Sequence, residues 1–254
     1  MSAASTAGDL TTTPLTDGVS LLQVAHRRPA LRCAQPPTYG HGHADALSIL
    51  FYWDNTPVLI DLGSGQYNAD QDVRKYFRSS IAHYTIEICS KNQADMLGHF
   101  LWDKLYTVEK ISSSLSPLLM VQTRHDGYSY KCSIEHHRRI TWHDIEHIEV
   151  HDRFICRTGL AIREGFHLDP ACIGVKSVNN KFIADLKKFH FIISFPHQFD
   201  VKVYYGSREP FMGWRTTIYG QWEPIYSVVF NSKIADDNKY QIDFLIKKIY
   251  EVIF

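Results

Sequence analysis

Short apolar stretches separated by turn-forming residues run along most of the chain. In many of them apolar and polar residues alternate, which puts every second side chain on one face, as in a half-buried strand. The alternating stretches are residues 85–90, 147–151, 201–205 and 240–246, and two continuous apolar runs occupy residues 47–53 and 57–62. β-Branched and aromatic residues fill these stretches, as strands favour. The pattern predicts a chain made mostly of β-strands.

Helical patterns are few. Residues 70–78 and 183–189 are each compatible with a short helix, whereas residues 189–195 again predict a strand. Glycine, proline, asparagine and aspartate separate the predicted strands, which is typical of sandwiches and jelly rolls. We therefore predict an all-β fold, an antiparallel β-sandwich of the jelly-roll or supersandwich kind with a smaller C-terminal sheet.

The length of 254 residues allows one large domain or two small ones. The first 20 residues are rich in Ser, Thr, Ala and Gly, and we expect a loose lead-in over residues 1–25. Residues 26–254 then form the predicted β-sandwich domain. A sub-boundary is expected near residues 155–170, where the alternation breaks.

Charge and composition exclude several classes of protein. The chain has 27 Lys+Arg and 27 Asp+Glu, and this balance argues against a nucleic-acid partner. It has no run of about 18 apolar residues, so we predict no membrane span. Its start lacks the basic and apolar regions of a signal peptide. The five cysteines are widely spaced, so neither a disulfide framework nor a cysteine metal site is expected.

The sharpest chemical feature is the run Gly-His-Gly-His-Ala-Asp at residues 40–45. On a strand, His41 and His43 would project from the same face, and the glycines would let a ligand approach closely. Such a pair of imidazoles suits a borderline metal such as zinc. Taken alone, the pair is explained more simply by two solvated histidines in a glycine-rich loop.

Two later residues support the metal hypothesis. Asp61 follows the apolar residues 58–60, and a carboxylate at the end of a buried strand needs a partner. His83 stands just before the predicted strand at residues 85–90. Two histidines and one aspartate on adjacent strands would make a three-ligand site with an open position. The simpler alternatives are a turn-forming aspartate and a histidine at a strand entry.

Basic residues form two clusters. Arg74, Lys75 and Arg78 lie near His83 in the sequence, and arginine can bind uronate or sulfate through two parallel hydrogen bonds. A solvated charged turn explains them equally well. The second cluster, His-His-Arg-Arg at residues 136–139, looks like a polyanion patch. On a strand, alternate residues face opposite ways, so only half of it could serve one surface.

These segments together resemble the β-sheet domain of heparinase II/III-like polysaccharide lyases. The resemblance rests on residues 40–48, 58–63 and 74–83, and it covers roughly residues 30–230. Shorter matching pieces are Gln93, residues 98–102, residues 137–139, Asp152, residues 213–216, residues 219–220 and Pro224. The combination is specific, although each piece is short.

The resemblance implies a function and a site. Members join an N-terminal α/α toroid to a C-terminal β-sandwich and cleave uronic-acid polysaccharides by β-elimination. It implies one zinc ion, held mainly for structure by His43, Asp61 and His83. It implies further that His41 faces the cleft as a catalytic residue, with Arg74 and Arg78 as the candidate substrate-binding residues. An acidic polysaccharide substrate and a periplasmic or secreted location follow from the same resemblance.

Two features depart from the family pattern. This chain carries no helical array ahead of the β-domain, and the family's catalytic tyrosine lies on that toroid, so we expect a separate toroid domain or subunit. Tyr84 stands where the family usually has asparagine, and Leu62 stands where proline is common. Both changes alter the local geometry expected around the ligands.

Two other functions stay open. One is a stand-alone module that binds acidic polysaccharide without turnover. The other is a cupin-like metal enzyme, since cupins also use two histidines at this spacing. Cupins usually add a glutamate three or four residues later, where this chain has Ala46 and Leu47. The sequence does not identify the polysaccharide.

Overall fold

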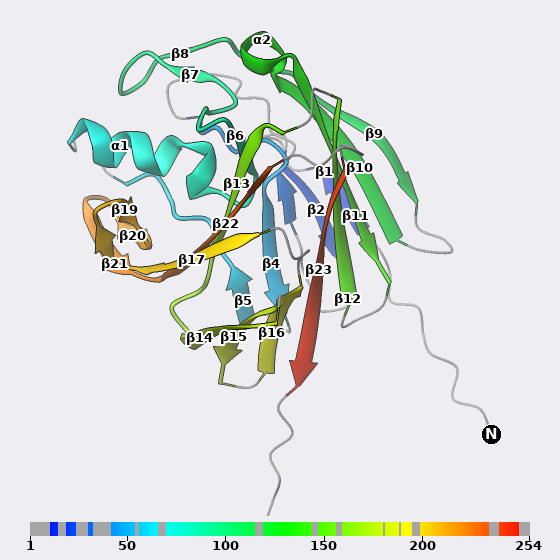
Figure 1. Cartoon of the computed structure of the whole chain (residues 1–254), viewed down its shortest axis with the longest axis vertical. Helices are drawn as coiled ribbons and strands as arrows, with labels where there is room; N and C mark the ends of the chain where they lie inside the picture. The colour runs from blue at the N-terminus through cyan, green and yellow to red at the C-terminus, as the bar shows by residue number, and fades with distance from the viewer. Residues whose placement is uncertain are drawn as a thin grey trace, which may run out of the picture.

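The computed structural model describes thirteen segments of the chain, which are residues 11–14, 19–23, 30–32, 42–53, 56–65, 70–114, 119–143, 147–155, 159–179, 181–187, 189–194, 199–233 and 239–248. Strands dominate these segments, and their pairings are antiparallel (Figure 1). The predicted all-β antiparallel fold is therefore confirmed. No helix in the described segments is long and apolar enough to cross a membrane.

Three large sheets and three small hairpins make up the fold. The five-stranded sheet consists of β1 (Thr11–Pro14), β2 (Val19–Gln23), β3 (Ala30–Arg32), β4 (Ile49–Trp53) and β5 (Thr56–Leu59). The eight-stranded sheet has the spatial order β14 (Cys172–Val178), β15 (Lys181–Leu186), β16 (Phe189–Ser194), β23 (Lys239–Lys248), β12 (His147–Ile155), β11 (Ile134–Trp142), β10 (Leu119–Tyr128) and β9 (Val108–Ser114). The four-stranded sheet has the order β17 (Asp200–Tyr205), β22 (Tyr226–Lys233), β13 (Ala161–His167) and β6 (Ile86–Ile88). The hairpins pair β7 (Asp95–Met96) with β8 (Trp102–Asp103), β18 (Ser207–Arg208) with β19 (Phe211–Met212), and β20 (Trp214–Ile218) with β21 (Gln221–Pro224).

Helical structure is confined to α1 (Gln71–Arg78), the 3₁₀ turn η1 (Ser80–Ala82) and α2 (Ser129–Cys132) within the described segments. The prediction of a helix at residues 70–78 is confirmed, and the Asp70 side chain caps it by accepting from the Asp72 N–H. The alternative of a helix at residues 183–189 is wrong, because this stretch contains the end of β15 and the start of β16. Every second residue of β15 is buried, so its period is that of a strand.

The main core lies between the three sheets. Phe51 of the five-stranded sheet stacks on Phe191 of the eight-stranded sheet, with ring centroids 5.5 Å apart. Phe182 of the eight-stranded sheet meets Phe230 of the four-stranded sheet at 6.5 Å. These contacts join the sheets through one continuous cluster of buried side chains, which is the packing of a sandwich.

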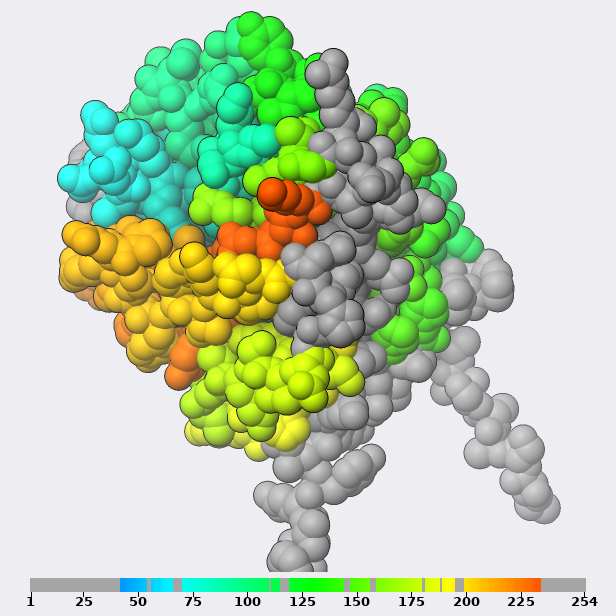
Figure 2. All heavy atoms as spheres, in the orientation of Figure 1, coloured from blue at the N-terminus to red at the C-terminus, as the bar shows by residue number. Residues whose placement is uncertain are grey.

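A smaller core fixes α1 on the other side of the four-stranded sheet. Tyr76 and Phe77 of α1 pack edge-on against Phe211, and Phe77 also meets Trp222. On the surface, α1 and the segment that forms the hairpins β18–β21 lie side by side (Figure 2). This packing holds the C-terminal end of α1, and the turn η1 after it, in a fixed place.

The domain boundaries remain predictions. The chain passes from the eight-stranded to the four-stranded sheet between β12 and β13, within the expected sub-boundary at residues 155–170. The strands β1 and β2 lie inside the segment predicted as a lead-in.

Candidate metal centre

The loop at residues 42–48 leads into β4 and carries His43. Of the two conformations considered for this stretch, the strand is not formed, because residues 42–48 have no strand pairing, and the loop is, although His43 is buried in it and not solvated. Buried hydrogen bonds shape the loop instead. The Gln93 side chain accepts from the Ala46 N–H at 2.8 Å and donates to the Ala46 carbonyl at 3.1 Å. His41 lies outside the described residues, so its predicted catalytic role stays a prediction.

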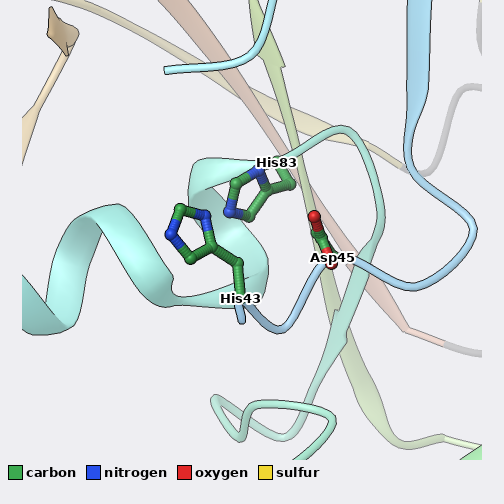
Figure 3. A group of neighbouring side chains, drawn as sticks. All are labelled: His43, Asp45 and His83. Carbon is green, nitrogen blue, oxygen red and sulfur yellow. The ribbon is translucent and has the colours of Figure 1, made fainter. Parts of the chain in front are cut away.

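Three buried side chains with metal-binding atoms converge beside this loop. They are His43 and Asp45 from the loop and His83 from the turn after α1 (Figure 3). One ligand-type atom of each lies within 4.8 Å of the other two, and the two imidazole centroids are 5.1 Å apart. The three residues are 9%, 5% and 2% exposed. Two imidazoles and one carboxylate form a donor set that suits zinc.

Asp61 lies next to His83, two residues after the end of β5. Its Oδ2 atom is 3.1 Å from Nδ1 of His83, and its Oδ1 atom accepts from the Gly63 N–H at 2.7 Å. With Nδ1 engaged by this carboxylate, Nε2 is the nitrogen through which His83 would bind a metal. Histidine ligands commonly donate their other ring N–H to a carboxylate in this way.

The structure thus brings all three predicted ligands, His43, Asp61 and His83, into one region. It groups Asp45, however, with the two imidazoles at ligand distance. Asp45 was missed as a ligand candidate, although it stands two residues after His43 in the same glycine-rich run. The signal was a carboxylate and an imidazole close together in the sequence, which a sharply turning loop can bring to one point.

His43 is in the form that a metal needs. Burial, and then the neighbouring His83, lower the pKa of His43 to about 4, so the imidazole is neutral near pH 7. Its Nδ1 atom is buried and has no hydrogen-bond partner among the described residues, while its Nε2 atom lies 3.5 Å from Ser64 Oγ. A buried polar atom of this kind calls for a ligand, an ion or a water, so these residues fit a zinc ion.

Arg138 of β11 links the backbone segments on which the candidate ligands lie. Its guanidinium is fully buried and donates to the carbonyls of Leu47 and Tyr84 at 3.0 and 3.1 Å. Leu47 belongs to the loop of His43, and Tyr84 directly follows His83. Asp152 and Glu164 in turn hold the guanidinium at 2.5 to 2.9 Å. One side chain therefore connects the two segments that carry the candidate ligands.

The two arginines proposed for substrate binding are also buried. Arg74 donates to the Ser64 carbonyl at 2.7 Å. Arg78 donates to the carbonyls of Gly98 and His99 at 2.8 and 2.7 Å and stacks over the Trp102 ring at 4.3 Å. In this arrangement both guanidinium groups organise backbone around the site, and their binding of substrate stays a prediction.

The chain belongs to the family described as heparinase II/III-like, C-terminal, whose model matches residues 18–232. Among solved structures it is similar to a mutant of heparan sulfate lyase HepC from Pedobacter heparinus, with a TM-score of 0.75 and 12% identity over 95% of this chain. It is also similar to a heparinase III, with a TM-score of 0.73 and 16% identity over 97% of this chain. No curated protein sequence matches the chain.

At these identities the structural likeness shows a common fold. The chain spans 37% of the length of each of these two solved chains.

Proposed function

We propose that the chain is the C-terminal β-domain of a polysaccharide lyase that cleaves uronic-acid-containing glycans by β-elimination. Its contribution is a metal site and the cleft residue His41. The observation that carries this proposal is the buried group of His43, Asp45 and His83, in a chain that belongs to a heparinase-like family. A separate α/α toroid domain or subunit completes the site, and the proposed location is periplasmic or secreted.

The metal-binding part of the proposal rests on the donor set. His43 and His83 would hold a zinc ion together with Asp45 or Asp61. When bound, the ion supplies positive charge and stabilises the loop that carries His41. Arg138 keeps the two ligand-bearing segments together from the core side.

The catalytic part follows from the chemistry of a uronate. The C5 proton of a uronate is weakly acidic. Positive charge or hydrogen-bond donors near the carboxylate stabilise the negative charge that develops when this proton is removed. A base removes the proton and an acid protonates the leaving oxygen at C4. His41 is suited to contact the carboxylate or to move a proton near neutral pH. Arg74 and Arg78 are proposed to support uronate binding next to the metal site.

The test measures metal content and ultraviolet absorbance of unsaturated uronate on the same purified protein. We expect about one divalent metal per chain and loss of that metal in the variant His43→Ala/His83→Ala. Equal metal content in wild type and this variant, with unchanged folding, would contradict the metal site. Unsaturated product from the chain with any uronic-acid polysaccharide would establish lyase activity.

The alternative function is a module that binds acidic polysaccharide without turnover. The solved lyases are longer than this chain, which spans 37% of each, and a β-domain that acts without their remaining parts would bind the polymer and not cleave it. Binding of a uronic-acid polysaccharide without product, even after a toroid partner is added, would support this alternative over the lyase.

A further inference from the structure

A block of basic side chains lies on the outer face of the eight-stranded sheet. It comes from the cluster at residues 136–139, whose members face opposite ways along β11. His136 and Arg138 point into the core and are fully buried, whereas His137 and Arg139 are on the outer face. Arg138 extends from the inner face of the sheet to the loop at residues 42–48, which carries His43. The basic side chains on the outer face are therefore separated from the candidate metal centre by the sheet.

The register of β11 and β12 makes this block compact. His137 of β11 is paired with Arg153 of β12. Two residues further along, Arg139 is paired with His151 on the same outer face. Paired strands are about 4.8 Å apart and alternate residues about 7 Å apart, so the four side chains cover one small area. Basic residues directly opposite each other disfavour the strand pairing unless something compensates them. Glu135 and Glu149 compensate the block at its ends, and an anion at its centre would add to this compensation.

A cavity of about 450 Å³ opens over this block. Its described lining consists of Gln122, His137, Arg139, His151 and Arg153, without a carboxylate among them. This volume falls within the range of small-molecule sites, about 300–1,000 Å³. Gln122 stands beside Arg139 on β10 and adds an amide that can hydrogen-bond a sugar hydroxyl.

Acidic residues lie only at the two ends of the block in the described part of this face. Glu135 accepts from His137 Nε2 at 2.5 Å and also pairs with Arg124, and Glu149 lies 3.5 Å from Arg139. Arg139 also donates to Nδ1 of His151 at 3.1 Å, which places both side chains together at the cavity. Arg153 is exposed and has no ion-pair partner among the residues described. The centre of the block thus presents donors for an anion.

We propose that this cavity is a second binding site, for an acidic saccharide unit held through its sulfate or carboxylate group. Arg153 and Arg139 bind the anionic group, and Gln122 contacts a neighbouring hydroxyl. The choice of a saccharide over other anions rests on the proposed function, whereas the anion site itself does not. A lyase domain with such a site would hold the polymer at a second point, on the face opposite the metal centre.

The experiment compares two charge-matched variants of the full chain. Arg139→Gln/Arg153→Gln removes two charges from the block, and Lys202→Gln/Lys233→Gln removes two exposed charges from β17 and β22. Calorimetry measures binding of a heparin-derived disaccharide, an unsulfated hyaluronan tetrasaccharide and neutral maltotetraose. We expect the first variant to weaken binding of an acidic saccharide at least tenfold and the second to change it less than twofold. The two acidic probes distinguish a sulfate site from a carboxylate site.

Several outcomes would overturn the proposal. These are equal losses in both variants, unchanged binding in the first variant, and equally tight binding of maltotetraose. Histidine ring signals in NMR give an independent readout, because saccharide should shift those of His137 and His151 and leave those of His43 and His83. The variant His83→Ala separates the two proposals, since it disables the metal centre and should leave saccharide binding at the outer block unchanged.

Discussion

The Nδ1 atom of His83 lies 3.1 Å from the Oδ2 atom of Asp61, and the same imidazole belongs to the buried group that also holds His43 and Asp45. Asp61 therefore orients His83, fixes its tautomer and raises the basicity of the opposite nitrogen. We infer that the two carboxylates of the site have different roles, with Asp45 as the direct ligand and Asp61 as the partner that orients His83.

The first prediction concerns these two carboxylates. Asp61→Asn should weaken metal binding about 10- to 100-fold, the range for outer partners of ligating histidines. Asp45→Asn should weaken it more, because a direct ligand loses its charge. Competition with a chromogenic chelator measures both affinities, and Asp72→Asn on the exposed surface of α1 is the control. A larger loss in Asp61→Asn than in Asp45→Asn would reverse the two roles.

The second prediction concerns the buried network around Arg138. Burial by itself would raise the pKa of Asp152, but Arg138 and His136 outweigh it and hold this pKa below its usual value. Arg138→Met would leave Asp152 and Glu164 buried without their cation. Such a loss costs about 3–5 kcal/mol. Urea denaturation should show this loss, while Arg139→Met on the exposed face should change stability by less than about 0.5 kcal/mol.

The third prediction concerns a glycine behind the turn that carries His83. A Cβ atom on Gly165 of β13 would lie 2.5 Å from the Ile81 carbonyl oxygen, so the turn η1 would have to move. Gly165→Ala should therefore lower metal affinity as well as stability. Gly174→Ala is the matched control, since its nearest neighbour would be 3.9 Å away. Wild-type metal affinity in Gly165→Ala would show that the turn shifts without disturbing the site.

The fourth prediction is a loss of stability in mild acid. Burial, and then His83, lower the pKa of His167 to about 3, and the same two causes lower that of His43 to about 4. In the unfolded chain both histidines bind a proton near pH 6.5. Between about pH 6.5 and pH 4 the unfolded state therefore holds more protons, and the free energy of unfolding falls as the pH falls.

Each of these histidines contributes at most about 1.4 kcal/mol per pH unit. Urea denaturation of metal-free protein at pH 7, 6 and 5 measures the slope. His167→Asn should make this slope shallower, by at most the contribution of one proton. A free energy of unfolding that stays constant from pH 7 to pH 5 would show that these histidines are protonated in the folded state.

The predictability of the fold varied with the length of each pattern. Alternation over several residues identified β12, because a strand buried on one face repeats every two residues. It also identified β17, although Val203 and Tyr205 on its apolar face are exposed. The helix α1 was also identified, and the structure adds that Asp70 caps it. The segment at residues 183–189 was ambiguous, since a short apolar run fits both periods until its partner strands are known. Pairing of β15 with β14 and β16 resolved it.

Prediction of the site was uneven for a related reason. Family-like motifs pointed to His43, Asp61 and His83, and these residues do lie together. The loop conformation at residues 42–48 was missed, because it depends on hydrogen bonds to Gln93, which is distant in the sequence. The burial of Arg74 and Arg78 was missed for the same reason, since their acceptors are carbonyls of other segments.

The sequence by itself determined that this is a β-protein of the heparinase-like family with a histidine and aspartate cluster, because strand periodicity and short motifs are local properties. Only the tertiary structure placed Asp45 beside the two imidazoles and showed which half of residues 136–139 faces the core. Both depend on how separate strands pair, and a shift of one residue in register would exchange the inner and outer faces.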